Sequence, residues 1–126
     1  MSNKPLVLVV DDDVDLGSML QLILNGGGYQ THVASSGSEA LRWLERNQPD
    51  LVLLDIMMPD VSGFTVLRQI RSRHSDGEMP VVLVTAFADD QTESQGASAG
   101  ANSLLRKPLR PRELLDHLGK LVQTSR

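Results

Sequence analysis

Short apolar runs alternate with longer segments of helical periodicity along the whole chain. The runs favour β-structure and predict five strands, at residues 6–10, 29–34, 51–54, 81–84 and 103–106, of which the second is partly polar and so partly exposed. The segments that follow them predict helices over about 14–25, 37–47, 64–74 and 112–122, with a weaker helix inside 86–102. Strands that alternate with helices are typical of a parallel sheet covered by helices on both faces. The pattern therefore predicts an α/β fold.

The ends of these predicted helices carry capping signals. Asp13 precedes the first helix as a candidate N-cap, and the glycines at 26–28 close it. Ser36 and Glu39 have the spacing of a capping box before the second helix, which must end before Pro49. The segment 86–102 contains two glycines, several Ser and Thr, and few large apolar residues. Because such residues are poor helix formers, we expect this helix to be the least stable element.

The composition is that of an ordinary globular protein. A chain of 126 residues is close to the commonest domain size, so we expect one domain over 1–126. Hydrophobic residues make up 40% and charged residues 22%, which argues against disorder. Aromatic residues are only 3%, so the core must be built mainly from aliphatic side chains, Met and Ala.

Charge and residue usage exclude several classes of function. The net charge of −4 and the isoelectric point of about 5.2 disfavour direct binding of nucleic acid or of anionic membranes. No apolar stretch approaches the roughly 18 residues of a membrane span, and the N-terminal run is too short for a signal peptide, so we expect a cytoplasmic protein. The absence of cysteine removes disulfides, thiolate metal sites and cysteine nucleophiles. His32, His74 and His117 show no metal-ligand spacing.

Four of the predicted strands end at polar residues that suit phosphoryl chemistry. Asp11 and Asp12 follow the first strand, and Asp55 follows the third. Thr85 follows the fourth strand, and Lys107 follows the fifth. In an α/β fold the carboxyl ends of parallel strands share one edge, and that edge is where ligands bind. We therefore expect these side chains to meet in one crevice.

The chemistry of this set points to a divalent cation and a carboxylate nucleophile. Asp11 and Asp12 would repel Asp55 as bare anions, whereas Mg²⁺ prefers such oxygen ligands and keeps several waters. The three carboxylates, one Mg²⁺ and the Lys107 ammonium together carry no net charge. Asp55 stands alone at its strand end, so it is the candidate for attack on a phosphoryl group to form an acyl phosphate. Mg²⁺, Lys107 and the Thr85 hydroxyl could then neutralise the three phosphoryl oxygens.

At this point a family resemblance is clear. The segments VLVVDDD (7–13), LVLLDIMMPDVSG (51–63), VVLVTA (81–86) and GANSLLRKP (100–108) resemble the receiver domain of two-component response regulators. The resemblance covers nearly the whole chain, with every motif in the expected order. It implies a flavodoxin-like (βα)5 fold, with a five-stranded parallel sheet of order 2-1-3-4-5.

The resemblance also implies roles for the site residues. The Asp at the position of Asp55 is phosphorylated by a histidine kinase or a phosphotransfer protein. Mg²⁺, or Mn²⁺ in its place, is held by Asp12, Asp55 and the backbone carbonyl of Met57, while Asp11 acts mainly through a metal-bound water. The residues matching Thr85 and Lys107 sense the phosphoryl group. The peptide bond before Pro108 is expected to be cis.

Several positions depart from the family pattern. Leu104 replaces the aromatic residue that usually moves with the threonine during switching, so coupling is expected through the loop after Thr85 and the helix inside 86–102. Met57 and Phe87 lie two residues after Asp55 and Thr85, where fast-hydrolysing members place polar groups. We therefore expect a phosphoryl group that lasts for minutes or longer.

The resemblance further implies the partners. A downstream effector or output domain should bind the face made by the helix inside 86–102, the strand 103–106 and the helix 112–122. The pair 102–103 is Asn-Ser where many members have two acids, which weakens the case for charged dimer contacts. We expect a monomer or a weak, phosphorylation-dependent dimer. The sequence does not say whether the chain acts alone or within a longer regulator.

Three other functions compete with this interpretation. A phosphatase of the haloacid dehalogenase type also uses a strand-end aspartate, but it needs a general acid where Met57 stands. A flavodoxin-like cofactor binder would need a loop rich in Ser, Thr and Gly after the first strand, where this chain has acids. A pseudo-receiver that binds partners without phosphorylation is disfavoured because no phosphorylation residue is missing. We expect a signalling protein that catalyses only its own phosphorylation and dephosphorylation.

Overall fold

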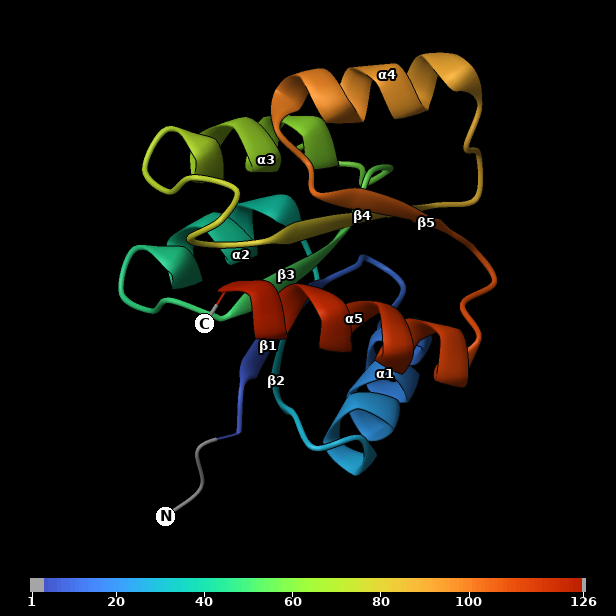
Figure 1. Ribbon diagram of the computed structural model, residues 1–126. Coiled ribbons are helices and arrows are strands. Elements are labelled where there is room, and N and C mark those ends of the chain that lie inside the picture. Colours follow the sequence, from blue (N-terminus) through green and yellow to red (C-terminus); the bar gives the residue numbers. More distant parts are fainter. Residues whose placement is uncertain (1–3, 126) are drawn as a thin grey trace.

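The computed structural model describes residues 4–125, so the ends of the predicted 1–126 domain, residues 1–3 and 126, lie outside the described residues. Strands and helices alternate throughout (Figure 1). The strands are β1 (Leu6–Val10), β2 (Gln30–Ala34), β3 (Leu51–Asp55), β4 (Val81–Thr85) and β5 (Ser103–Arg106). The helices are α1 (Val14–Gly26), α2 (Gly37–Leu44), α3 (Gly63–Arg71), α4 (Asp90–Ala99) and α5 (Pro111–Ser125).

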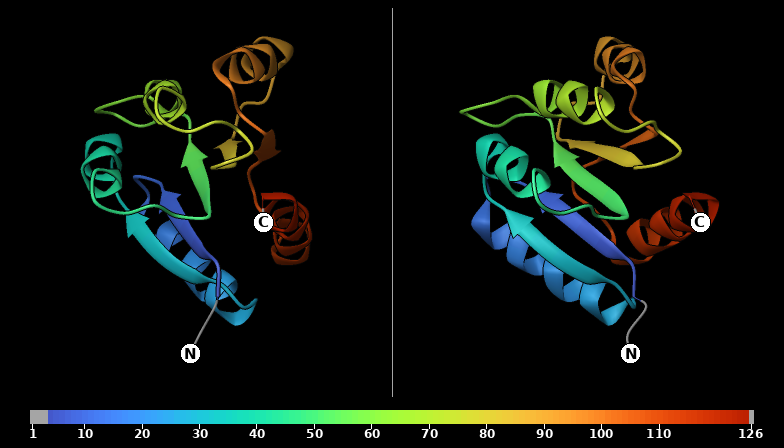
Figure 2. Two further views of the ribbon diagram at one scale, coloured as in Figure 1. Left: turned by 60° about the vertical axis from the view of Figure 1, so that its left-hand side comes forward. Right: turned by 90° about the vertical axis from the view of Figure 1, so that its left-hand side faces the viewer.

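The strands form one parallel sheet in the order β2-β1-β3-β4-β5. Helices α1 and α5 cover one face, and α2, α3 and α4 cover the other (Figure 2). This architecture confirms the flavodoxin-like fold and the strand order implied by the family resemblance. Because crossover helices return the chain to the same end of the sheet, the carboxyl ends of all five strands lie along one edge.

Burial on both faces explains why the strands read as continuous apolar runs. Leu8 and Val10 belong to the core under α2, α3 and α4, while Val7 and Val9 belong to the core under α1 and α5. The central strand β3 is buried along its whole length. As expected from the composition, aliphatic side chains dominate both cores.

The predicted helix boundaries are correct to within about three residues at most ends. Helix α2 ends at Leu44 and α3 at Arg71, each three residues earlier than predicted. The end of α3 has a visible cause, since the Arg71 guanidinium donates hydrogen bonds to the carbonyls of His74 and Ser75, at 3.4 and 3.3 Å, and so holds the following residues in a turn. Helix α5 starts one residue early, at Pro111, a residue favoured in the first helical turn.

Both predicted N-caps form, but the Glu39 side chain of the predicted capping box bonds to a different residue from the one expected. The Asp13 side chain accepts a hydrogen bond from the Leu16 N–H at 3.1 Å, as expected of the N-cap of α1. The Ser36 hydroxyl accepts from the Glu39 N–H at 3.1 Å and caps α2. The Glu39 carboxylate, however, accepts from the N–H and hydroxyl of Ser35, at 3.2 and 2.9 Å, so the box closes one residue before the N-cap.

The segment 86–102, predicted to form a weak helix, does contain a helix. It is α4, which spans only the 10 residues Asp90–Ala99. Helix α4 begins after the N-cap Asp89 and ends at Ala99, before the C-cap Gly100, whose φ of 100° suits glycine. Its buried residue is Gly96, where an added Cβ would lie 2.8 Å from a Leu83 methyl group. The helix therefore packs its backbone on β4 and contributes few large side chains to the core. Its low stability stays a prediction.

Within the part of the chain described here, no helix combines the length and the hydropathy that a membrane crossing requires.

Candidate functional site

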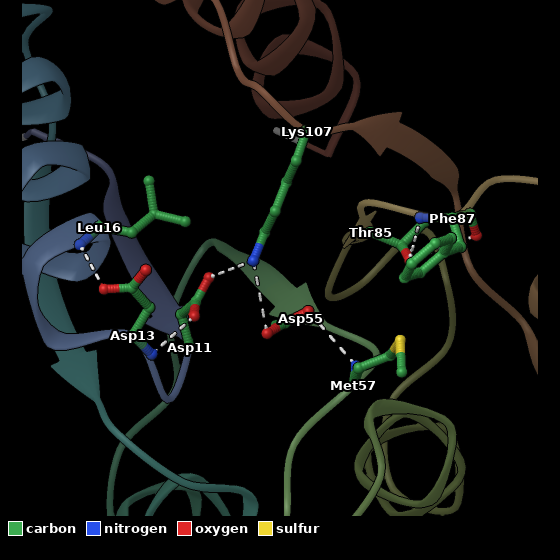
Figure 3. Close-up of polar contacts among 8 residues, drawn as sticks. All are labelled: Asp11, Asp13, Leu16, Asp55, Met57, Thr85, Phe87 and Lys107. Atoms are coloured by element: carbon green, nitrogen blue, oxygen red, sulfur yellow. Dashed lines mark hydrogen bonds and ion pairs between the residues drawn. The ribbon is translucent and has the colours of Figure 1, made fainter.

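The polar residues predicted to meet at strand ends do lie at one edge of the sheet. Asp11 and Asp12 directly follow β1, Asp55 is the last residue of β3, and Thr85 is the last residue of β4. Lys107 directly follows β5. The close-up in Figure 3 shows the Lys107 side chain reaching toward Asp11 and Asp55, with Thr85 farther along the edge beside Phe87.

Three carboxylates form the acidic centre of this site. Asp11 and Asp55 are almost fully buried, at 3% and 5% exposure, and Asp12 is exposed. One carboxylate oxygen of each residue lies within 4.8 Å of the other two. Among residues 4–125, no other group of three acidic or histidine side chains converges in this way. The cluster is therefore the candidate cation site.

Lys107 lies between two of the carboxylates. Its Nζ is 3.2 Å from an Asp11 oxygen and 3.5 Å from an Asp55 oxygen. Burial lowers the pKa of Lys107, but the hydrogen bond and the charge of Asp11, together with Asp55, outweigh burial and raise it. The side chain is thus an ammonium ion held between Asp11 and Asp55. The peptide bond that follows it, before Pro108, is cis, as the family resemblance implies.

The electrostatics of Asp55 indicate that the cluster lacks positive charge. Burial and the neighbouring Asp11 carboxylate raise the pKa of Asp55 to about 6, although Lys107 opposes the shift. One ammonium ion is therefore not enough to balance three carboxylates. A hard divalent cation fits this donor set, because all three side chains offer oxygen ligands and none offers sulfur or nitrogen. Asp12, Asp55 and the nearby backbone of residue 57 are the groups that could hold it.

The loop between β3 and α3 is closed tightly against Asp55. The Met57 N–H donates to the Asp55 carboxylate at 3.3 Å, and the Met57 side chain is 61% exposed. The Gly63 N–H donates to the Ile56 carbonyl at 2.8 Å. A Cβ at Gly63 would collide with the Asp55 carbonyl oxygen and lie 2.7 Å from the Ile56 Cα. Glycine at position 63 thus lets α3 begin against the backbone of Asp55.

Thr85 is buried, at 1% exposure, but its hydroxyl is engaged with its own loop. It accepts a hydrogen bond from the Phe87 N–H at 3.0 Å and donates to the Phe87 carbonyl at 3.3 Å. The Phe87 side chain is 67% exposed. Thr85 therefore lies at the predicted edge with its hydroxyl bonded to Phe87, while its backbone carbonyl accepts a hydrogen bond from the Lys107 N–H at 2.9 Å.

Leu104 lies on β5, paired in register with Leu83 of β4. It is half-buried and lines a cavity of about 240 Å³ between α4 and β5, together with Gly96 and Ala97. The space beside Leu104 therefore lies under α4, next to the close approach of Gly96 to Leu83. Another cavity, of about 210 Å³, lies at the opposite end of the sheet between the ends of α2 and α3 and contains none of the site residues.

The three histidines lie outside the acidic cluster. The His32 ring stacks on Trp43 with a centroid distance of 4.6 Å. His74 Nδ1 lies 3.1 Å from a Glu78 carboxylate oxygen. His117 Nε2 is 2.6 Å from the Ser103 hydroxyl, a contact that joins α5 to β5.

Three residues whose structural roles the sequence did not reveal join distant segments, Asp60 beside the site and Arg71 and Asn102 at the opposite end of the sheet. Asp60, in the loop after β3, accepts hydrogen bonds from the start of α2. Arg71 donates to the Gly100 carbonyl at 2.7 Å and to the Asn102 side-chain oxygen at 2.8 Å. Asn102 was noted only as a departure from a family pattern, yet its side-chain oxygen also accepts from the Val81 N–H at 2.9 Å. These contacts join residues that are 20 or more positions apart, and no local sequence signal marks them.

Comparison with known proteins agrees with the geometry. The family described as response regulator receiver domain matches residues 7–119. The DNA-binding response regulator MtrA of Mycolicibacterium smegmatis is 41% identical over 109 residues, which are 86% of this chain and 46% of that protein. The transcriptional regulatory protein GltR of Pseudomonas aeruginosa is 34% identical over 124 residues, which are 98% of this chain and 51% of that protein. The chain thus spans about half the length of these relatives.

Solved structures show the same fold over almost the full chain. A CheY-like response regulator receiver domain protein from Methanospirillum hungatei has a TM-score of 0.91 and 28% identity, covering 98% of this chain and 97% of that one. The receiver domain of the Francisella response regulator 1452 has a TM-score of 0.90 and 28% identity, covering 98% of this chain and all of that one.

Proposed function

The chain belongs to the response regulator receiver domain family, and from this premise we propose that it is a switch controlled by phosphorylation of Asp55. The phosphoryl donor is the phosphohistidine of a sensor histidine kinase or of a phosphotransfer protein. The observation that carries the proposal is the position of Asp55, which is 5% exposed, shares a cluster with Asp11 and Asp12, and lies 3.5 Å from the Lys107 ammonium. A candidate nucleophile, a candidate cation site and a positively charged side chain thus lie close together.

The proposed cofactor is Mg²⁺, with Mn²⁺ as an alternative. Asp12, Asp55 and the Met57 carbonyl would hold it, with Asp11 acting through a bound water. When bound, the ion supplies positive charge to the phosphoryl oxygens and neutralises the carboxylate cluster. The raised pKa of Asp55 supports this assignment, because the metal-free cluster has too little positive charge to keep the nucleophile fully ionised at mildly acid pH.

The reaction is a transfer between two side chains. A carboxylate oxygen of Asp55 attacks the phosphorus of the phosphohistidine, an O–P bond forms, and the P–N bond breaks with its electron pair leaving on the imidazole. The product is an acyl phosphate on Asp55. Lys107 already lies 3.5 Å from an Asp55 oxygen and needs only a small shift to bind a phosphoryl oxygen. The chain therefore catalyses its own phosphorylation and, with water as acceptor, its own dephosphorylation.

Signalling follows from a change of partner at Thr85. In the unphosphorylated chain the Thr85 hydroxyl is bonded to the backbone of Phe87. A phosphoryl oxygen on Asp55 is a stronger acceptor, so the hydroxyl turns toward it and releases the loop that leads into α4. An active conformation that is minor before phosphorylation then becomes dominant. Leu104, which lines the cavity under α4, moves with this helix rather than rotating as a ring would.

The proposed output surface is the face made by α4, β5 and α5. It binds a downstream effector or an output domain, and the chain itself does not bind nucleic acid. The relatives named above as DNA-binding and transcriptional regulators are about twice as long, which supports an output through a further domain or partner. Ser103 is hydrogen-bonded to His117 within the chain, which favours a monomer or a weak dimer over one built on charged pairs at this position.

A phosphatase of the haloacid dehalogenase type is the less favoured alternative. The side chain two residues after Asp55 would have to act as its general acid, and Met57 has no proton to donate. A pseudo-receiver would lack one or more of the groups assembled here. The complete set of Asp11, Asp12, Asp55, Thr85 and Lys107 therefore favours a phosphorylated switch.

Phosphotransfer from labelled histidine kinases tests this function. The purified chain is mixed with several autophosphorylated kinases, in Mg²⁺ and in EDTA, and label is followed on both proteins. At least one kinase is expected to lose label to this chain within minutes in Mg²⁺ and not in EDTA. Transfer that is equally fast in EDTA would overturn the metal assignment, and no transfer from any kinase or small phosphoryl donor would overturn the function.

A further inference from the structure

The loop that follows the proposed phosphoacceptor also caps a helix. Asp60, at the tip of the loop between β3 and α3, accepts hydrogen bonds from the N–H groups of Gly37 at 3.3 Å and Ser38 at 3.1 Å. The third N–H of α2, that of Glu39, bonds to the N-cap Ser36 at 3.1 Å. The first N–H groups of a helix have no partner inside it, and here two of the three are satisfied from another segment.

The charge of Asp60 suits this position. A carboxylate at a helix N-terminus is stabilised by the partial positive charge of the unpaired N–H groups. Hydrogen bonds from the side chain and backbone of Ser38 lower the pKa of Asp60 to about 2, so the group is ionised at neutral pH. The carboxylate can therefore accept both N–H groups at neutral pH.

Close packing beside Asp60 strengthens the same contact. A Cβ at Gly37 would lie 2.8 Å from the Val61 Cβ and 2.9 Å from the Val61 carbonyl oxygen. Glycine at the first position of α2 thus lets the helix approach the loop closely enough for the two hydrogen bonds to form. A larger residue at 37 would push Val61, and the loop with it, away from α2.

The loop is held at its base as well. The Gly63 N–H bonds to the Ile56 carbonyl at 2.8 Å, and the Met58 side chain is buried at 9% exposure. Between these points Met57 and Pro59 are exposed. The packing of Met58 is not directional, whereas the two hydrogen bonds of Asp60 fix the direction in which the exposed part of the loop runs.

From this arrangement we propose that Asp60 is a positioning residue for the metal site. By tying the loop to α2, it keeps the backbone of Met57 in place, so that its carbonyl is already oriented when a divalent cation arrives. The inference rests on the proposed function, because it needs the cation site at Asp12 and Asp55. Outer partners of this kind hold metal ligands in position and change affinity when they are removed.

Calorimetric titration of the unphosphorylated chain with Mg²⁺ tests the inference without any phosphorylation assay. Asp60→Ala is expected to weaken Mg²⁺ binding about tenfold, the low end of what loss of an outer partner costs at metal sites. Asp60→Asn keeps one oxygen acceptor, but its amide NH₂ cannot accept the second N–H, so it is expected to weaken Mg²⁺ binding less than Asp60→Ala does. Ser36→Ala is the matched control, since it uncaps the same helix without touching the loop, and it should leave the Mg²⁺ affinity unchanged.

A second variant disturbs the contact between Asp60 and α2 through a change in the helix and not in the loop. Gly37→Ala leaves Asp60 intact but displaces Val61, and it should weaken Mg²⁺ binding in the same direction as Asp60→Ala. If Asp60→Ala fails to fold, Gly37→Ala and Asp60→Asn carry the test. Urea unfolding followed by Trp43 fluorescence separates a general loss of stability, which Ser36→Ala shares, from the loss of affinity.

The Mg²⁺ titrations distinguish a failure of the Asp60 inference from a failure of the proposed function. Wild-type affinity in both Asp60→Ala and Gly37→Ala would overturn the inference and leave the proposed function intact. A wild-type chain that binds no Mg²⁺ would overturn the metal site and the inference together.

Discussion

The Thr85 hydroxyl is hydrogen-bonded to the backbone of Phe87, two residues further along the chain, and not to the carboxylate cluster. Because Thr85 is buried while Phe87 is 67% exposed, this bond joins the inner edge of the site to the surface of the loop before α4. A ligand that accepts a hydrogen bond from the Thr85 hydroxyl would displace the bond that the hydroxyl donates to the Phe87 carbonyl. We expect the loop to change its arrangement when this bond is exchanged.

Replacing Thr85 should uncouple phosphorylation from the conformational change. In Thr85→Ala the acceptor Asp55 is untouched, so labelling by acetyl phosphate should persist. The hydrogen bond to a charged phosphoryl group contributes about 1.5–3 kcal/mol, so its loss should lower the active population at least about tenfold. NMR shifts of the α4 amides on adding beryllofluoride measure this population. Thr85→Ser, which keeps the hydroxyl, should retain the response, and an Ala variant that responds fully would contradict the account.

Stability of the metal-free chain should depend on the ionisation of Asp55. Its pKa of about 6 in the folded protein lies above the usual value of 3.8, so the folded state holds this proton more tightly than the unfolded chain. The contribution of Asp55 to stability is therefore complete below pH 4 and is lost as the pH rises through about 6. In EDTA, Asp55→Asn should unfold at higher urea than the wild type above that pH, by on the order of 1–3 kcal/mol. The two proteins should converge at acid pH, and a less stable Asn variant at pH 8 would contradict the assignment.

Met57 and Phe87 are both exposed, at 61% and 67%, and neither can orient a water molecule. The acyl phosphate should therefore last for minutes or longer in the purified chain. Met57→Glu places a base beside Asp55 and should shorten the lifetime about tenfold or more. Met19→Glu adds the same charge at an exposed position of α1 and serves as the control. Loss of the phosphoryl group within seconds from the wild type, without a phosphatase, would contradict this prediction.

Arg71 should be important for stability although no part of the catalytic chemistry depends on it. Its guanidinium donates to the carbonyls of Gly100 and Met79, at 2.7 and 2.8 Å, and to the Asn102 side chain at 2.8 Å. Arg71→Ala removes the donor to the Gly100 and Met79 carbonyls and one of the two donors to the Asn102 oxygen, and it should lower the free energy of unfolding by about 2–4 kcal/mol. Arg68→Ala, at an exposed position of the same helix, should change it by less than about 0.5 kcal/mol. Equal effects of the two substitutions in urea unfolding would show that the Arg71 contacts are not stabilising.

The strand-end residues could be predicted because a parallel sheet turns sequence position into spatial position. Asp55 and Lys107 are 52 residues apart, yet each ends or follows an apolar run, and this alone brings them to one edge. The family motifs then supplied the strand order. Both inferences depend on local patterns and on a general rule of topology.

Other contacts depend on the detailed path of loops, which no local pattern specifies. Asp60 reaches α2 across 22 or more positions, and Arg71 reaches Asn102 across 31. The partner of the Thr85 hydroxyl was also beyond prediction, because a threonine at a strand end has several acceptors within reach. Helix ends were misplaced for the same reason, as the turn after α3 is set by the Arg71 side chain.

The most direct test of the central claim is intact-mass spectrometry after incubation with acetyl phosphate and Mg²⁺. The wild type should gain the mass of one phosphoryl group, lost again at alkaline pH as expected of an acyl phosphate, and Lys107→Ala should still gain it because the acceptor remains. Asp55→Asn should gain none. A phosphoryl group that still appears on Asp55→Asn would contradict the assignment of Asp55 as the acceptor.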